Sequence, residues 1–218
     1  MPSKPPVAPA APDLPDELDT AAPPDELARG ELEGVLLEGL DLSERDASRL
    51  ALVESKLLRV DLTGAGLQGS TLRDLVVEEG SWANVRASNA TLRRVRFDRV
   101  RLTGVDLGGT AIEDATFADC RIDLASLRAA KLAHVVFERC RLEEADLQTA
   151  TLTSCLFVDC SLTRVSLAEA AFVRSEMRSC DLAGVGNPER LRGVRMPWPD
   201  VVNAAAELAE AAGIEIVD

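Results

Sequence analysis

The 218-residue chain is long enough for one substantial domain with tails; 46% of its residues are hydrophobic, but only 3% are aromatic and none is tyrosine. Acidic residues outnumber basic residues by 37 to 24, and the net charge of −13 disfavours direct binding to nucleic acid or to anionic lipid. No run of 18 apolar residues occurs, so we expect no transmembrane helix and no membrane partner.

Residues 1–30 have the composition of a tail. Eight of the 11 prolines lie in the first 24 residues, together with many alanines and acids. The segment lacks the apolar stretch that is typical of a secretory signal. We therefore expect residues 1–30 to be disordered and partly polyproline-like, and we expect a cytoplasmic protein.

A five-residue repeat follows the tail. Every fifth residue from Leu32 to Leu182 is apolar, with no insertion, and a second column of mostly small residues lies two positions before each of these. An α-helix cannot use this pattern, because five residues rotate an apolar stripe around the helix by about 140°. Residues two apart share a face in an extended chain, so each unit is expected to be a short extended piece followed by a polar bend.

Two columns show how many units make one coil. Phenylalanine recurs every 20 residues at Phe97, Phe117, Phe137 and Phe157, and cysteine recurs in the same way from Cys120 to Cys180. A period of 20 residues places four pentapeptides in each coil and stacks like residues about 4.8 Å apart. The sequence therefore predicts a four-sided tube.

Units such as AGLQG at 65–69, VDLGG at 105–109 and ADLQT at 145–149 resemble the A(D/N)LXX repeats of the pentapeptide-repeat family. This resemblance implies an all-β solenoid, a right-handed quadrilateral β-helix of about seven to eight coils, over residues 31–185. Two positions fit the repeat poorly. Arg45 falls on an inward position, so it either escapes through the open end of the tube or distorts the first coil. Gly80 is small, and we expect Trp82 to fill the volume that it leaves.

Residues 186–218 form a separate C-terminal segment. The repeat ends at Gly186-Asn187-Pro188, and the sequence then predicts one helix from Pro199 to Ala212, with Gly213 as its stop. This helix either caps the open end of its own solenoid or also forms a homodimer contact, as the resemblance to mycobacterial family members implies. The face expected to do so consists of Val201, Ala205, Leu208 and Ala212.

The chemistry-bearing residues do not indicate catalysis. All five cysteines fall on the small inward column, so we expect buried structural thiols rather than a metal site. The single histidine, His134, falls on an outward bend. We find no nucleophile paired with a base and no phosphate-binding loop, so we expect a protein that is not an enzyme and has no cofactor or metal.

Two charged columns are candidate interaction surfaces. One alternates in sign and predicts a vertical ion-pair ladder: Glu79, Arg99, Asp119, Arg139 and Asp159. The other is a basic strip: Arg101, Arg121 and Arg141. Either Asp119 and Asp159 neutralise this strip, or it binds an acidic partner.

Two functions are consistent with these features. The first is a binding scaffold with an unknown protein partner. The second follows from a weak resemblance to the quinolone-resistance group, whose members mimic DNA and protect DNA gyrase or topoisomerase IV. Residues 91–150 hold ten acids and ten bases, although a DNA mimic should be acidic there. A continuous acidic face would favour the mimic, and a patchwork of charge would favour the scaffold.

Overall fold

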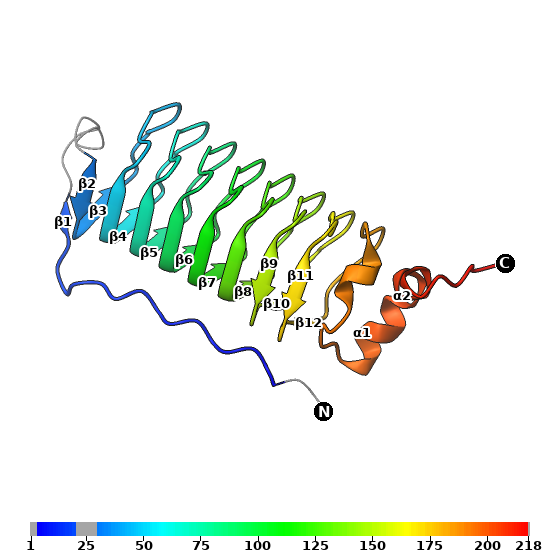
Figure 1. Ribbon diagram of the computed structural model, residues 1–218. Helices are drawn as coiled ribbons and strands as arrows, with labels where there is room; N and C mark the ends of the chain where they lie inside the picture. Colours follow the sequence, from blue (N-terminus) through cyan, green and yellow to red (C-terminus); the bar gives the residue numbers. More distant parts are fainter. Residues whose placement is uncertain (1–3, 21–29, 218) are drawn as a thin grey trace.

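The computed structural model describes residues 4–20 and 30–217, and it is a four-sided solenoid of about eight coils (Figure 1). Each coil takes 20 residues, and the coils run in regular order from Glu31 to Gly186. The β-strands are β1 Asp19–Thr20, β2 Glu31–Glu33, β3 Val35–Glu38, β4 Ala51–Leu58, β5 Thr71–Glu78, β6 Thr91–Asp98, β7 Ala111–Ala118, β8 Lys131–Glu138, β9 Thr151–Thr153, β10 Leu156–Val158, β11 Ala171–Val173 and β12 Glu176–Arg178.

The strands pair in parallel with a constant offset of 20 residues. Leu52 lies opposite Leu72, and Phe97 lies opposite Phe117, within one twelve-stranded sheet that covers two sides of the tube. The other two sides consist of turns joined by isolated parallel bridges, such as Arg101 to Arg121. The five-residue and 20-residue periods are therefore confirmed as the units of the side and of the coil.

Each pentapeptide ends on a residue with left-handed backbone conformation. Glu79 (φ 56°), Asp119 (φ 53°) and His134 (φ 54°) are examples, and the same conformation recurs at every fifth residue through the coils. Left-handed residues turn the chain sharply, so they form the four corners of the tube. Four columns of corner side chains consequently run along the solenoid.

The core is a stack of like side chains. Phe97, Phe117, Phe137 and Phe157 lie ring over ring, with centroids 4.8–5.0 Å apart. Trp82 ends this stack with an edge-on contact to Phe97, 5.1 Å between centroids. The predicted ladder of phenylalanines is therefore confirmed.

The structure answers both questions raised by the poor repeats. Arg45 is exposed, and its coil keeps the same turns as the later coils, so the arginine escapes to solvent without distorting the coil. The expectation of spare volume at Gly80 is wrong. A Cβ atom there would lie 2.6 Å from the backbone oxygen of Val60, so glycine permits a close approach of two coils, and Trp82 is buried beside it.

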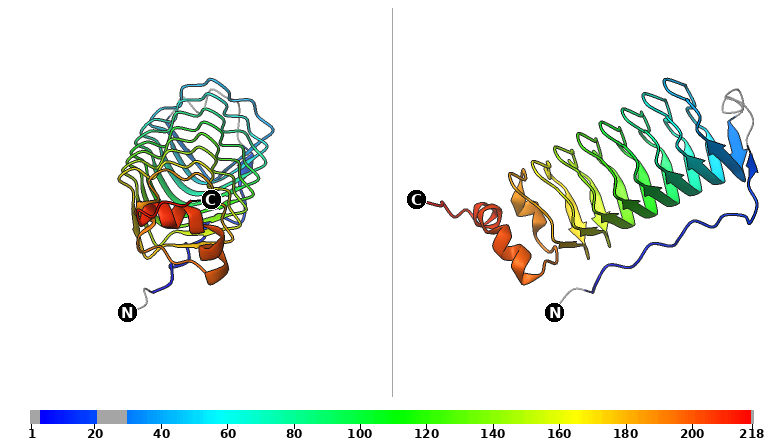
Figure 2. Two further views of the ribbon diagram at one scale, coloured as in Figure 1. Left: turned by 90° about the vertical axis from the view of Figure 1, so that its right-hand side faces the viewer. Right: turned by 180° about the vertical axis from the view of Figure 1, so that it is seen from behind.

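Residues 4–20 differ from the disordered tail that their composition predicts. They run as an extended segment along the outside of the solenoid (Figures 1 and 2), and β1 pairs with β3. Backbone N–H groups of this segment donate to carboxylates of the coils, which composition cannot reveal. The rest of the expected tail, residues 1–3 and 21–29, lies outside the described residues.

The C-terminal segment contains two short helices instead of one. A 3₁₀ turn, η2 (Pro188–Leu191), places Leu191 over the end of the core, and α1 (Trp198–Asn203) and α2 (Ala205–Ala211) follow. The break falls at Ala204, which is buried. None of the helices in the described ranges is long and apolar enough to cross a membrane.

The break changes which side chains face the solenoid. Of the four residues expected to share one face, Val201 and Leu208 are half-buried, and Leu208 packs against the core. Ala205 and Ala212 are exposed, so these two residues do not pack against the last coil. Ala204 takes the inward position, four residues after Asp200, whose carboxylate contacts the last coil.

Candidate interaction surfaces

The alternating column forms ion pairs along one corner of the tube. Arg99 contacts Glu79 at 3.0 Å, and Arg139 contacts Asp119 through two hydrogen bonds of 2.8 Å. In the part of the chain that the structure describes, no ion pair joins Arg139 to Asp159. The column is therefore two pairs and not a continuous ladder.

The hydrogen bonds from Arg139 hold the pKa of Asp119 below its ordinary value, and the bond to Glu79 raises the pKa of Arg99. All of these groups are exposed, so solvent screens the pairs and each stabilises the fold little. The sequence reasoning missed one member of this corner. Arg59 lies one coil before Glu79 and pairs with Glu38, and the 20-residue period was the signal for it.

Arg101, Arg121 and Arg141, which we call the basic strip, stack on successive coils and are exposed. Arg141 contacts Glu143 at 2.9 Å, and Arg121 lies 3.7 Å from Asp123. These two acids neutralise the strip in part, in place of the Asp119 and Asp159 expected from the sequence. The reason is that residues two apart share one side of the tube. Arg101 has no ion-pair partner among the residues described.

Acidic and basic residues are mixed in columns on three sides of the tube. The column of the basic strip begins and ends with acids, namely Asp41, Asp61 and Asp181. On the next side, Arg86 interrupts a column of aspartates that includes Asp106 and Asp146. On the sheet, Arg93 lies next to Arg73 and Glu113. The surface is therefore a patchwork without a continuous acidic side.

The cysteines are packed as core residues. Cys120, Cys140, Cys155 and Cys160 are buried, whereas Cys180 in the last coil is only partly buried. The thiols of Cys140 and Cys160 donate to backbone carbonyls, at 3.3 Å from Phe117 and from Val158. Burial raises the pKa of Cys155 to about 12, which keeps the thiol protonated at neutral pH. A buried, protonated thiol such as that of Cys155 suits packing and is a poor nucleophile.

His134 lies at a corner, where its Nδ1 is 3.4 Å from a carboxylate oxygen of Asp114. The same oxygen accepts a hydrogen bond from the backbone N–H of Ala10. The histidine is therefore part of a contact with the N-terminal segment. Over the described ranges, no three histidine, cysteine or acidic side chains are grouped to hold a metal ion.

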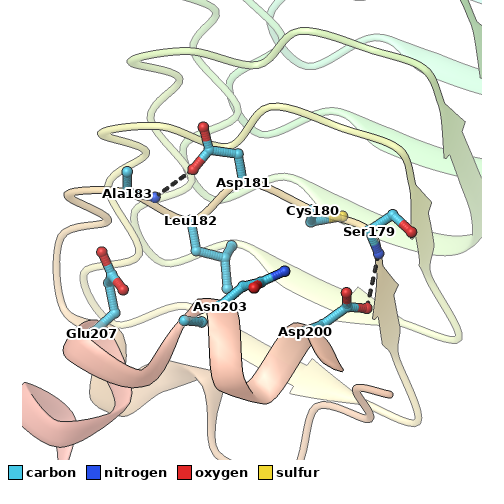
Figure 3. A pocket seen from close by; sticks show the side chains of 9 residues that line it. Ser179, Cys180, Asp181, Leu182, Ala183, Asp200, Asn203 and Glu207 are labelled. Atoms are coloured by element: carbon cyan, nitrogen blue, oxygen red, sulfur yellow. Dashed lines mark hydrogen bonds between the residues drawn. The ribbon is translucent and has the colours of Figure 1, made fainter. Parts of the chain in front are cut away.

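A cleft of about 430 Å³ separates the last coil from α1 and α2 (Figure 3). Asp200 accepts the backbone N–H of Ser179 at 2.8 Å, and Glu207 accepts that of Gly184 at 3.3 Å. In the preceding coil, the equivalent N–H groups of Asp159 and Arg164 donate to carbonyls of the coil that follows. The two carboxylates thus replace a further coil and cap the solenoid.

Comparison with known proteins gives a family-model match over part of the repeat and a shared fold. Residues 90–157 match the family model described as a pentapeptide repeat region. No curated protein matches the sequence. The solenoid is similar to the solved structure of full-length QnrB1, a plasmid-mediated fluoroquinolone resistance protein. The TM-score is 0.56 and the identity 15%, over 82% of this chain and 100% of that chain.

Two further structures are similar at lower scores. HetL, a pentapeptide repeat protein involved in heterocyst differentiation regulation from the cyanobacterium Nostoc sp. strain PCC 7120, is 18% identical over 78% of this chain and 90% of that chain, with a TM-score of 0.41. A pentapeptide repeat protein from the Arabidopsis thaliana thylakoid lumen is 21% identical over 50% and 72%, with a TM-score of 0.42. The uninterrupted repeat from Leu32 to Leu182 and the coils that it forms have the pattern and fold of pentapeptide-repeat proteins, and the family model matches this repeat over residues 90–157.

Proposed function

We propose that the protein is a non-enzymatic scaffold that binds an acidic segment of a partner protein along its basic strip. The observation that carries this proposal is the geometry of Arg101, Arg121 and Arg141 on successive coils. Coils lie about 4.8 Å apart, so the three guanidinium groups span about 10 Å along one side. Arginine forms bidentate contacts with carboxylates, and this spacing suits carboxylates on an extended peptide.

The patchwork of charge supports a scaffold in preference to a mimic of DNA. A DNA mimic presents an extended negative surface, whereas acids and bases interleave along the sides of this tube. Interleaved charge specifies one partner, because a wrong partner meets like charges. The hydrogen-bonded coils also hold the side rigid, which lowers the entropy cost of binding.

The test uses the purified full chain as bait. Partners captured from cell extract are identified, and the affinity of each purified partner is then measured by calorimetry. We expect the triple variant Arg101→Glu, Arg121→Glu, Arg141→Glu to bind its partner at least about tenfold more weakly. The matched control, Arg86→Glu, reverses a charge on another side and should leave the affinity unchanged. Equal loss in both variants would contradict the basic strip as the binding surface.

The second candidate function is interaction with DNA gyrase or topoisomerase IV. The net charge of −13 favours it, and so does the fold shared with QnrB1, a fluoroquinolone resistance protein. The balanced charge of residues 91–150 opposes it. If the protein restores the supercoiling activity of gyrase in the presence of a fluoroquinolone, it interacts with topoisomerases; a scaffold for another protein would not do so.

We also propose that the C-terminal segment forms a homodimer. Trp198 and Val202 lie four residues apart on α1 and are 74% and 54% exposed, and Ile214 and Ile216 are exposed nearby in sequence. Helical residues four apart share a face, and exposed apolar patches favour association. Light scattering should give a dimer, and the double variant Trp198→Asp, Val202→Asp should give a monomer. Leu124→Asp, at an exposed leucine on the solenoid, is the control that should remain dimeric.

A further inference from the structure

The segment from Lys4 to Thr20, which we call the strap, is held against one corner of the solenoid at three places. At its C-terminal end, β1 pairs with β3, and the N–H of Asp19 donates to the carbonyl of Gly34 at 2.8 Å. Further along, the N–H of Asp13 donates to Asp74 at 3.0 Å, and the N–H of Ala10 donates to Asp114 at 3.1 Å. The strap crosses successive coils, as Figure 2 shows.

The spacing of prolines in the strap matches the spacing of the coils. Prolines occur every third residue at Pro6, Pro9, Pro12 and Pro15. A polyproline II helix has three residues per turn and rises about 3.1 Å per residue, so one turn covers about 9 Å. Two coils cover about 10 Å. One turn of the strap therefore advances by two coils, from Asp74 to Asp114.

The burial of the strap follows the same period from Pro6 to Pro12. These prolines at positions 6, 9 and 12 are half-buried and the residues between them are exposed, whereas Pro15 is exposed and Leu14 is half-buried. The residue after each proline keeps its N–H, and a threefold period points these N–H groups to the same side. The strap thus presents one row of prolines and one row of donors to the solenoid.

The corner under the strap alternates between acceptors and basic side chains. Asp74 is 1% exposed and forms two hydrogen bonds of 2.5 Å with Arg94, the next residue along the corner. Asp114 lies 3.4 Å from His134 in the same way. Burial raises the pKa of Asp74, but the bonds from Arg94 and from the N–H of Asp13 outweigh it and hold this pKa below its ordinary value. Both acceptors are thus fixed for a backbone donor.

A third acceptor continues the register. Ser154 follows Asp114 by two coils, as Asp114 follows Asp74. Val7 precedes Ala10 by three residues, as Ala10 precedes Asp13, but among the described residues no hydrogen bond joins Val7 to Ser154. Ser154 is 1% exposed, and its Oγ has no hydrogen-bond partner among the described residues. A buried hydroxyl without a partner costs free energy, which a backbone donor at this position removes.

We propose that this corner, from Asp74 to Ser154, is a docking site for a proline-rich segment of a partner protein with a proline at every third position. The strap occupies the site in cis as a competing ligand. Recognition depends on the spacing between backbone donors along the bound segment. The corner accepts backbone N–H groups two coils apart, and prolines of the segment lie between these donors. The site is separate from the basic strip, so it stands whether or not that strip binds a partner.

The experiment cuts the strap free while keeping every part of the chain. A protease recognition sequence is inserted within residues 21–29 of the full chain, and the cleaved protein is titrated with a fluorescent peptide of residues 4–20. We expect the peptide to exchange with the cut strap at a Kd of about 10–100 μM. Uncut protein should bind the peptide at least about tenfold more weakly, because the tethered strap competes at millimolar effective concentration.

Variants test the register. Asp114→Asn should weaken peptide binding about tenfold, since a charged acceptor becomes a neutral one. A peptide with one alanine inserted after Pro9 should lose affinity similarly, because its donors no longer face the acceptors. Ser154→Asp should bind several-fold more tightly. Glu169→Gln, a corner carboxylate on another column, is the control and should bind as the parent does.

Three results would overturn the proposal. The first is no exchange at about 1 mM peptide, which would make the strap a permanent part of the fold. The second is equal binding to cut and uncut protein, which would place the peptide elsewhere. The third is equal affinity for the parent peptide and the peptide with the inserted alanine, which would show that spacing is not recognised. A melting curve of the cleaved protein establishes that it remains folded in each case.

Discussion

At the residue scale, stability depends on how closely successive coils approach one another. Side chains of the same column touch directly, so a column has no spare volume for a larger residue and no neighbour that can fill a gap. The phenylalanine stack contains the largest repeated side chains of the core, and Gly80 has no side chain because the backbone of the neighbouring coil lies close to it. Substitutions at both places should change the free energy of unfolding.

Replacing Phe137 by alanine should open a cavity in the middle of the stack. The ring lies between Phe117 at 5.0 Å and Phe157 at 4.8 Å. We expect a loss of about 3–5 kcal/mol in the free energy of unfolding, measured by chemical denaturation. Phe172→Ala truncates a phenylalanine that is only half-buried and should cost clearly less. A loss below about 1 kcal/mol for Phe137→Ala would show that the coils collapse to fill the space.

Two glycines form a matched pair for a test of close approach. A Cβ at Gly80 would lie 2.6 Å from the Val60 backbone oxygen, whereas at Gly186 the nearest atom is 3.6 Å away. Gly80→Ala should therefore destabilise the fold by about 1–3 kcal/mol, and Gly186→Ala should be nearly neutral. Thermal melting compares the two. Equal stability of both variants would contradict the account of Gly80 as a point of contact between coils.

The same scale shows where sequence reasoning succeeds and fails. The positions of Phe97 and Phe137 follow from periodicity, because stacking in a solenoid repeats every 20 residues. The partner of Arg121 does not follow as simply, since a long side chain can reach either a corner acid or one on its own side. It reaches Asp123 instead of Asp119. The partners in ion pairs therefore cannot be predicted from the repeat alone, whereas the residues of the core columns can.

At the element scale, each end of the solenoid needs groups that satisfy its last hydrogen bonds. Asp200 of α1 and Glu207 of α2 supply acceptors to the final coil. Sequence reasoning predicted the cap but not the break at Ala204, because alanine has high helix propensity and gives no local stop signal. Asp200 and Glu207 are seven residues apart, so they lie on the same side of the helical segment and both reach the coil.

The cap carboxylates should protect the last coil from local opening. In the double variant Asp200→Ala, Glu207→Ala, the N–H groups of Ser179 and Gly184 lose their acceptors. We expect hydrogen exchange at these two amides to accelerate at least about tenfold, while amides in β6 and β7 keep their rates. Glu210→Ala, at an exposed residue of α2, is the control. Unchanged exchange at Ser179 and Gly184 would show that the cap is held by apolar packing alone.

At the scale of the whole molecule, one repeat explains the architecture but not the partner. The fold follows from the sequence because every pentapeptide obeys the same rule of two inward side chains and one corner. The docking of the strap could not be predicted from its composition, which is that of a disordered tail. The spacing of its prolines indicates docking only when it is compared with the distance between coils, which the structure provides.

At the same scale, the distribution of charge favours the proposed scaffold over a mimic of DNA. Net charge alone suggests a mimic, but its distribution does not. Residues 1–30 and 186–218 together contribute −7 of the −13, and residues 91–150 are balanced. A protein that occupies a DNA-binding surface needs its negative charge along the solenoid, where electrostatic attraction acts at short range.

The most direct test is a DNA gyrase supercoiling assay with the purified full chain, with and without a fluoroquinolone. QnrB1, a plasmid-mediated fluoroquinolone resistance protein, serves as the positive control. A scaffold for another protein should change neither the supercoiling rate nor the drug inhibition at concentrations up to about 10 μM. Rescue of supercoiling in the presence of the drug, or inhibition of supercoiling in its absence, would contradict the scaffold function and establish the topoisomerase function in its place.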